Sequence, residues 1–261
     1  MGRFPVVALL VIAAVVVSTA SAREPRAKVP AKPAETHDLL AAEQAGLVTV
    51  KYIPNDSRSA QIVVTNRSDR PLTLRMPEVF AGVPVLAQFG APGGMANNGN
   101  AGFGAAGAPQ VTGGALPMNA GMGIGQPMGG GMFSLPPEKT RVSRVTTVCL
   151  EHGKPEPSPL RSYKLVELAA HSADPRLEQL MRSIGRGEIT QKVAQAAAWH
   201  IANGLSWEQL AAEKIDHAAG VPDEPYFAPA ELQAAFQVVG IVTKRAEAGE
   251  ASPGAAEYSS R

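Results

Sequence analysis

The chain has 261 residues, a formal net charge of +1 at pH 7 and a single cysteine. Near-neutral charge argues against a nucleic-acid-binding protein, because such proteins normally carry a basic excess. One cysteine excludes an internal disulfide framework and any metal site built from several cysteines. The length predicts one or two domains.

The N-terminus has the features of an export signal. A short basic start precedes an apolar run from Phe4 to Val17, and Ala20-Ser21-Ala22 supplies small residues at a cleavage site. This pattern predicts a signal peptide over residues 1–22, cleaved after Ala22, with an apolar run too short for a confident membrane span. An uncleaved anchor is the alternative. We therefore expect a secreted, periplasmic or cell-surface protein without an integral membrane span after cleavage.

Residues 23–45 are rich in proline, alanine and lysine near their start and predict an extended linker. The chain then carries runs of β-branched and aromatic residues separated by turn residues. These runs cover residues 47–53, 61–65, 72–74, 141–150 and 163–168. Short strands at this spacing predict an antiparallel, Ig-like β-sandwich over residues 46–170.

A low-complexity insert interrupts the predicted sandwich. Residues 90–132 hold 15 of the 26 glycines and 5 of the 8 methionines, and they contain no charged residue. Such a composition cannot bury enough apolar surface to fold, so we predict that the insert is disordered. Its methionines could form an adaptable sticky surface, with a featureless loop as the alternative.

Helical periodicity begins at Asp174, which can cap a helix that has Pro175 at its first position. Four apolar residues then follow with the spacing of one helix face: Leu177, Leu180, Met181 and Ile184. A second helix is predicted over residues 190–202, and Ser206 with Gln209 predicts a capping box for a third.

A fourth helix is predicted to start near Pro229, with Leu232, Phe236 and Val239 on one face. We therefore expect a helical hairpin region over residues 171–218, a C-terminal helix over 226–246 and a disordered tail over 247–261. The predicted fold class is α+β: a sandwich followed by a small helical region.

Complete catalytic motifs are absent from the sequence. It has no phosphate-binding loop, no nucleophile elbow and no histidine pair at the spacing of a helical zinc site. We therefore predict no metal and no cofactor. A cysteine hydrolase that uses Cys149 with His152 or His200 would lack an acid partner and an oxyanion motif, so we do not expect an enzyme.

Two short motifs point to a different use of the cysteine. Val148-Cys149-Leu150 ends a predicted strand, and the second helix carries Gln195, Ala197 and Trp199, with Gln195 and Trp199 one turn apart on one face. These residues resemble the secreted thioester domains, whose helix motif is T-Q-x-A-[IV]-W. The resemblance covers about residues 142–210.

The resemblance implies an internal thioester between Cys149 and Gln195 that attaches the protein covalently to amines on a surface protein or another target. Trp199 could shield the bond from water, and His152 lies in the loop after the cysteine. The alternative is a non-catalytic structural or interaction protein of the cell envelope, in which Cys149 and Trp199 are core residues and Gln195 is a solvated helix position.

Overall fold

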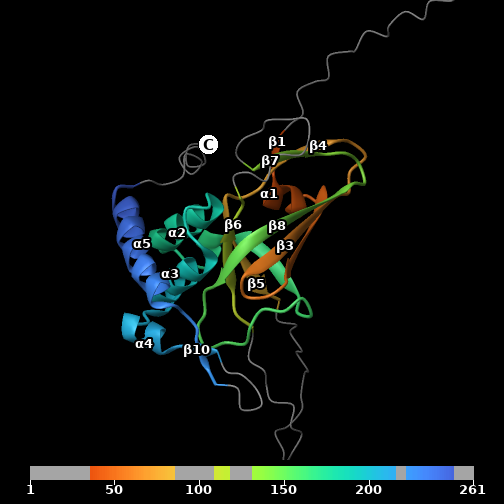
Figure 1. Cartoon of the computed structure of the whole chain (residues 1–261). Coiled ribbons are helices and arrows are strands. Elements are labelled where there is room, and N and C mark those ends of the chain that lie inside the picture. Colours follow the sequence, from red (N-terminus) through yellow and green to blue (C-terminus); the bar gives the residue numbers. More distant parts are fainter. Residues whose placement is uncertain (1–35, 86–108, 118–130, 216–221, 250–261) are drawn as a thin grey trace, which may run out of the picture. The chain divides into compact units, whose positions relative to one another are not determined.

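The computed structural model describes residues 36–85, 109–117, 131–215 and 222–249. Strands occupy the first part of the chain and helices the second (Figure 1), so the fold class is α+β, as predicted. The predicted signal peptide, residues 1–22, lies outside the described residues, as do residues 250–261 of the predicted tail.

Six strands form one closed antiparallel barrel in the order β2-β3-β8-β6-β5-β9. They are β2 (Val48–Pro54), β3 (Ser59–Asn66), β5 (Val79–Pro84), β6 (Thr112–Ala115), β8 (Thr140–Cys149) and β9 (Tyr163–Glu167). Strand β9 closes the sheet because it pairs with all of β5 from Phe80 onward and also with β2, where Tyr163 lies opposite Tyr52. The predicted two-sheet sandwich is therefore replaced by a single sheet that is closed on itself.

The start of the described chain contributes one strand to a small second sheet and then forms a short helix. The sheet contains β1 (Thr36–Asp38), β4 (Leu72–Arg75) and β7 (Met132–Leu135), with β4 in the centre. Helix α1 (Leu39–Gln44) begins at Asp38, whose carboxylate accepts from the backbone N–H groups of residues 40 and 41. The linker prediction is wrong for residues 36–44, because the buried side chains of Leu39 and Ala42 anchor this segment to the core.

Strand β6 lies within the insert that was predicted to be disordered. Its residues are all buried between β5 and β8. A β-carbon on Gly114 would lie 2.9 Å from the ring of Phe80, and one on Gly113 would lie 3.1 Å from Leu150 and Met181. Glycine is required here by close packing, so the prediction of disorder is wrong for residues 109–117, and it is also wrong at Met132, where β7 begins. Residues 90–108 and 118–130 of the insert lie outside the described chain.

Aromatic side chains fill the interior of the barrel. The rings of Tyr52 and Phe80 lie edge to face with centroids 6.1 Å apart, and the hydroxyl of Tyr52 is 2.6 Å from Oγ1 of Thr112. A β-carbon on Gly82 would overlap the ring of Tyr52. The interior of the barrel is thus filled with tightly packed side chains.

Four α-helices follow the barrel: α2 (Pro175–Gly185), α3 (Gln191–Asn203), α4 (Trp207–Ala212) and α5 (Pro229–Glu247). A single 3₁₀ turn, η1 (Leu168–Ala170), precedes them, and β10 (Lys214–Ile215) pairs with β11 (Glu224–Pro225) between α4 and α5. The predicted caps are confirmed at Asp174, where α2 begins, and at Ser206, which forms a capping box with Gln209. The predicted apolar face of α2 is buried along its whole length.

Helices α2, α3 and α5 pack together, and α2 and α3 contact β6 and β8 (Figure 1). Helix α5 buries Ala235 and Val242, with Val239 partly buried on the same face. The predicted face of this helix is wrong at Phe236, whose side chain is 63% exposed. Leu232 and Val239 are partly buried as predicted, and Ala235 takes the place expected for Phe236 on this face.

Candidate functional site

Cys149 is the last residue of β8 and lies beyond Ser59, the first residue of its neighbour β3. The pairing of β3 with β8 ends at Ser59 opposite Thr146, and the N–H of Thr147 still donates to the carbonyl of Arg58. Backbone groups alternate in direction along a strand, so the N–H and C=O of Cys149 face the same side as those of Thr147. No residue of β3 is there to meet them.

The side chain of Gln195 occupies this open edge. The N–H of Cys149 donates to Oε1 of Gln195 at 2.8 Å, and Nε2 of Gln195 donates to the carbonyl of Cys149 at 2.9 Å. Both residues are almost completely buried. The carboxamide thus makes the two hydrogen bonds that a peptide group of β3 would make if that strand extended further. The structure brings together the two residues that the sequence singled out, 46 positions apart, through the backbone of the cysteine.

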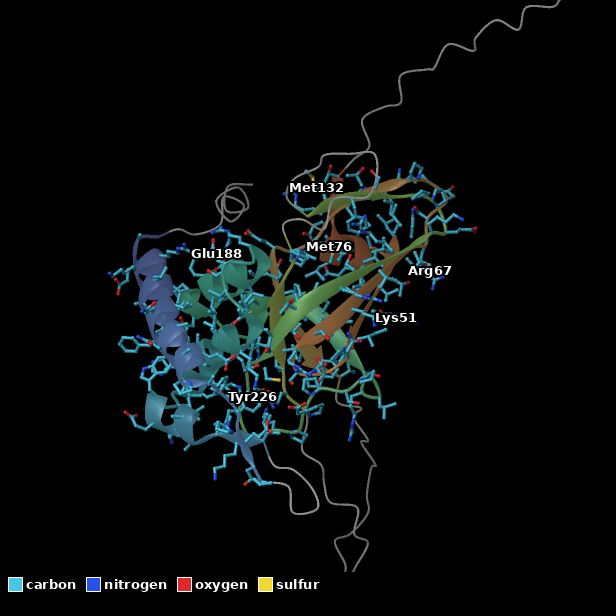
Figure 2. The ribbon with its side chains drawn as sticks, in the orientation of Figure 1. Lys51, Arg67, Met76, Met132, Glu188 and Tyr226 are labelled. Atoms are coloured by element: carbon cyan, nitrogen blue, oxygen red, sulfur yellow. The ribbon has the colours of Figure 1, made fainter. Side chains whose placement is uncertain are left out.

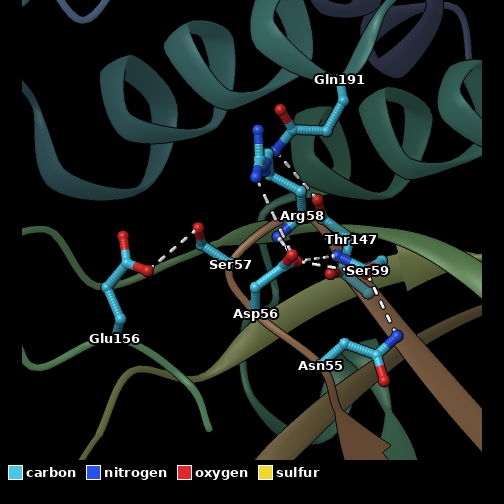
Figure 3. A network of polar contacts seen from close by, with 8 residues as sticks. All are labelled: Asn55, Asp56, Ser57, Arg58, Ser59, Thr147, Glu156 and Gln191. Atoms are coloured by element: carbon cyan, nitrogen blue, oxygen red, sulfur yellow. Dashed lines mark hydrogen bonds and ion pairs between the residues drawn. The ribbon is translucent and has the colours of Figure 1, made fainter.

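Helix α3 presents a second glutamine to the same edge of β8. Nε2 of Gln191 donates to the carbonyl of Thr147 at 3.2 Å (Figure 3). Four residues along a helix rise by about 6 Å and two residues along a strand by about 7 Å, so Gln191 and Gln195 match alternate residues of β8. Sequence reasoning missed Gln191 as a site residue. The signal was its spacing of four from Gln195.

Small side chains allow α3 to approach the strand closely. Ala194 and Ala197 are fully buried, with Ala196 and Ala198 beside them. Ala197, which the sequence singled out, is therefore a packing residue at the interface of the helix with its neighbours. The helix begins at Thr190, whose hydroxyl accepts from the N–H of Val193, and this cap fixes where both glutamines lie.

The thiol of Cys149 lies on the face of the sheet that Thr112 also occupies, because opposed residues of an antiparallel pair share a face. Burial, together with the negative charges of Glu156, Asp56 and Glu151, raises the pKa of this thiol to about 12. At neutral pH the sulfur is therefore protonated. Figure 3 shows Glu156 near Ser57, whose hydroxyl donates to it, and Asp56 in the turn between β2 and β3.

Trp199 lies one turn after Gln195 on α3 and is 7% exposed. Its ring contacts three others, with centroid distances of 4.6 Å to His152, 5.4 Å to Tyr226 and 5.8 Å to Phe227. Its indole Nε1 is buried and has no acceptor within the described part of the chain. Trp199 therefore packs among three other rings one turn after Gln195, and its indole donor is unpaired within the described residues.

His152 connects this aromatic cluster to α4. Its Nε2 lies 3.0 Å from a carboxylate oxygen of Glu213, and its backbone N–H donates to the side chain of Asn203. His200 lies apart from this contact: its Nδ1 is 2.8 Å from the carbonyl of Leu205, and its ring stacks on Trp207.

No group of three or more metal-ligating side chains occurs in the ranges that the structure describes. None of the helices in those ranges combines the length and apolar character that crossing a bilayer needs. Comparison with protein-family models, with curated proteins and with solved structures finds no match for this chain.

Proposed function

We propose that the protein is an exported envelope or extracellular module that attaches covalently to surface amines through a thioester between Cys149 and Gln195. The observation that carries this proposal is the position of the Gln195 carboxamide, which two hydrogen bonds hold against Cys149 in a buried site. Attack of a thiol on a carboxamide needs the two groups close together, fixed and shielded from water, and these bonds hold the carboxamide beside the residue that carries the thiol.

The chemistry follows from these contacts. Sγ of Cys149 bonds to Cδ of Gln195, the Cδ–Nε2 bond breaks, and ammonia leaves with the thiol proton. The N–H of Cys149 already donates to Oε1, so it polarises the carbonyl and stabilises negative charge that develops on this oxygen. The high pKa of the buried thiol requires that its proton moves to the leaving nitrogen during this step.

Release of the acyl group onto a target needs an amine. The amine nitrogen bonds to Cδ of Gln195, the Cδ–Sγ bond breaks, and a proton from the amine returns to the sulfur of Cys149. Trp199 supports the proposal as the residue that covers Gln195, and His152 supports it through its ring contact with Trp199. The target is then a surface protein or another amine-bearing molecule.

Intact-mass measurement tests the proposal. Protein secreted by its own host should be lighter than the mature sequence by one ammonia, and Cys149→Ala and Gln195→Ala should each abolish this difference. Treatment with methylamine should add one methylamine to Gln195, which leaves the protein one methylene heavier than the unmodified mature sequence, and should free one thiol. An unmodified mass together with a titratable thiol would refute the proposal.

A second function has its own supporting observation. Both hydrogen bonds use only the backbone of Cys149, so the pair joins α3 to the barrel without any reaction of the sulfur. This favours a non-covalent structural or interaction protein of the envelope. In that case Cys149→Ala should leave binding to envelope material unchanged.

A further inference from the structure

Residues 222–228 run across α3 beside Trp199, and we name this segment the strap. Its β11 residues pair with β10, and the N–H of Tyr226 donates to the carbonyl of Glu213, the residue after α4, at 2.8 Å. It ends where α5 begins, because the N–H of Ala228 donates to a carboxylate oxygen of Glu231. These backbone bonds fix the first part of the strap, and the contacts of Lys192 and Trp199 with Tyr226 and Phe227 hold its second part against α3.

Lys192 supplies the most specific of these contacts. Its Nζ donates to the carbonyl of Tyr226 at 2.6 Å and lies 3.7 Å from the centroid of the same ring and 5.6 Å from that of Phe227. One cation thus holds both the backbone and the aromatic faces of the strap. Burial lowers the pKa of Lys192, which agrees with a cation that the strap covers.

The strap covers the same end of α3 that carries Gln195. Lys192 precedes Gln195 by one turn and Trp199 follows it by one turn, so the two residues that the strap touches flank the glutamine. Phe227 is 2% exposed and packs in one cluster with Trp199 and Cys149. The free indole N–H of Trp199 lies under this cover and offers a donor to an entering polar group.

We infer that the strap controls access of reagents to the Cys149–Gln195 pair and that Lys192 is the positioning residue that keeps it closed. When the Lys192 contact opens, Tyr226 and Phe227 move away from Trp199 and the pair becomes reachable. This inference rests on the proposed function for its meaning, since the entering reagent would be the target amine. Its test does not depend on whether a thioester forms.

Cys149 is the single cysteine of the chain, so reaction of any thiol reagent reports on this site alone. Protein that carries the thioester is treated with methylamine, and the rate of amine incorporation is followed by mass. Protein that carries the free thiol is treated with N-ethylmaleimide, and the rate of labelling is followed in the same way. An unmodified mass in the wild type refutes the thioester and leaves the second measurement to decide on the strap.

Lys192→Met removes the cation and keeps the aliphatic stem. We expect the reaction rate to rise about tenfold or more, because a charge-assisted bond and a cation–π contact are lost together. Lys192→Arg retains both contacts and should stay within about twofold of the wild type. Lys51→Met, at an exposed lysine of β2 that Figure 2 labels together with Tyr226, is the matched control and should not change the rate.

Tyr226→Leu provides a second way to weaken the strap and should also raise the rate. Circular dichroism and the thermal midpoint verify that each variant is folded, so that a faster reaction reports local opening. Should Lys192→Met fail to fold, Tyr226→Leu with the same control decides. If the folded variants react within about twofold of the wild type, the strap does not control access and the inference is overturned.

Discussion

Replacement of Gln195 by alanine should destabilise the protein strongly, because this side chain satisfies both backbone groups of Cys149. Gln195 is fully buried and makes bonds of 2.8 Å and 2.9 Å to the N–H and C=O of that residue. Alanine leaves this donor and this acceptor buried beside the open edge of β8, where no strand can pair with them.

The expected loss follows from these contacts. An unpaired buried polar group costs about 1–3 kcal/mol, and the truncated side chain also leaves a cavity. We expect Gln195→Ala to lower the free energy of unfolding by about 3–5 kcal/mol, a large fraction of the usual stability of a domain. Gln195→Met fills most of the space but has no polar atoms to offer, so most of the loss should remain.

Chemical denaturation of the purified variants measures these changes. Gln191→Ala is the matched control, because this half-buried glutamine on the same helix makes one bond of 3.2 Å to Thr147. It should cost about 1 kcal/mol. If Gln195→Ala costs no more than Gln191→Ala, the side chain does not complete the strand edge and the reasoning fails.

A double-mutant cycle extends this measurement to the thioester. The hydrogen bonds use backbone atoms that Cys149→Ala retains, so without a covalent bond that substitution should leave the effect of Gln195→Ala nearly unchanged. A thioester joins the two side chains, and either substitution then removes the same cross-link. A coupling energy well above about 0.5 kcal/mol would therefore support the covalent form, and additivity would favour the structural one.

Two further predictions concern buried polar groups. Thr147→Val should keep or raise stability by about 0.5–1 kcal/mol in denaturation experiments, because Oγ1 of Thr147 is buried without a partner in the described chain. A loss above about 1 kcal/mol would show that this hydroxyl is bonded. In protein with the free thiol, burial raises the pKa of Cys149 from 9.0 to about 12, so its contribution to stability is complete below pH 9 and is lost as pH rises toward 12. The unfolded thiol loses its proton first, so the stability of the wild type relative to Cys149→Ala should fall over this range, and a constant or rising difference would contradict the assignment.

Strands β1, β5 and β7 were not predicted, but β2, β3, β4, β8 and β9 could be, because runs of β-branched residues stand there between turn residues. Strand β3, for example, buries every second residue along its length. Strand β6 could not be predicted by this reasoning, since Gly113 and Gly114 have no side chains to show a pattern. Only glycine fits these positions because the side chains of Phe80 and Leu150 lie so close, and they come this close only after the barrel has formed.

Closure of the barrel could not be predicted from the sequence either. It depends on β9 pairing with β2 as well as with β5, and the first of these pairings involves one residue pair, Tyr52 with Tyr163. The helix ends were easier to predict, because a cap is a local arrangement. Asp174 and Ser206 bond to backbone groups within three residues. Tertiary pairing, in contrast, joins segments that share no local signal.

The site depends both on local helix periodicity and on tertiary strand pairing. Gln195 and Trp199 share a helix face by local periodicity, but the open edge of β8 that receives Gln195 arises only because β3 does not begin until Ser59, opposite Thr146. Completion of that edge uses the backbone of residue 149 and places no demand on its side chain. The only cysteine of the chain nevertheless stands at this position. A thioester gives the sulfur a role there, whereas any small apolar residue would serve the structural function alone.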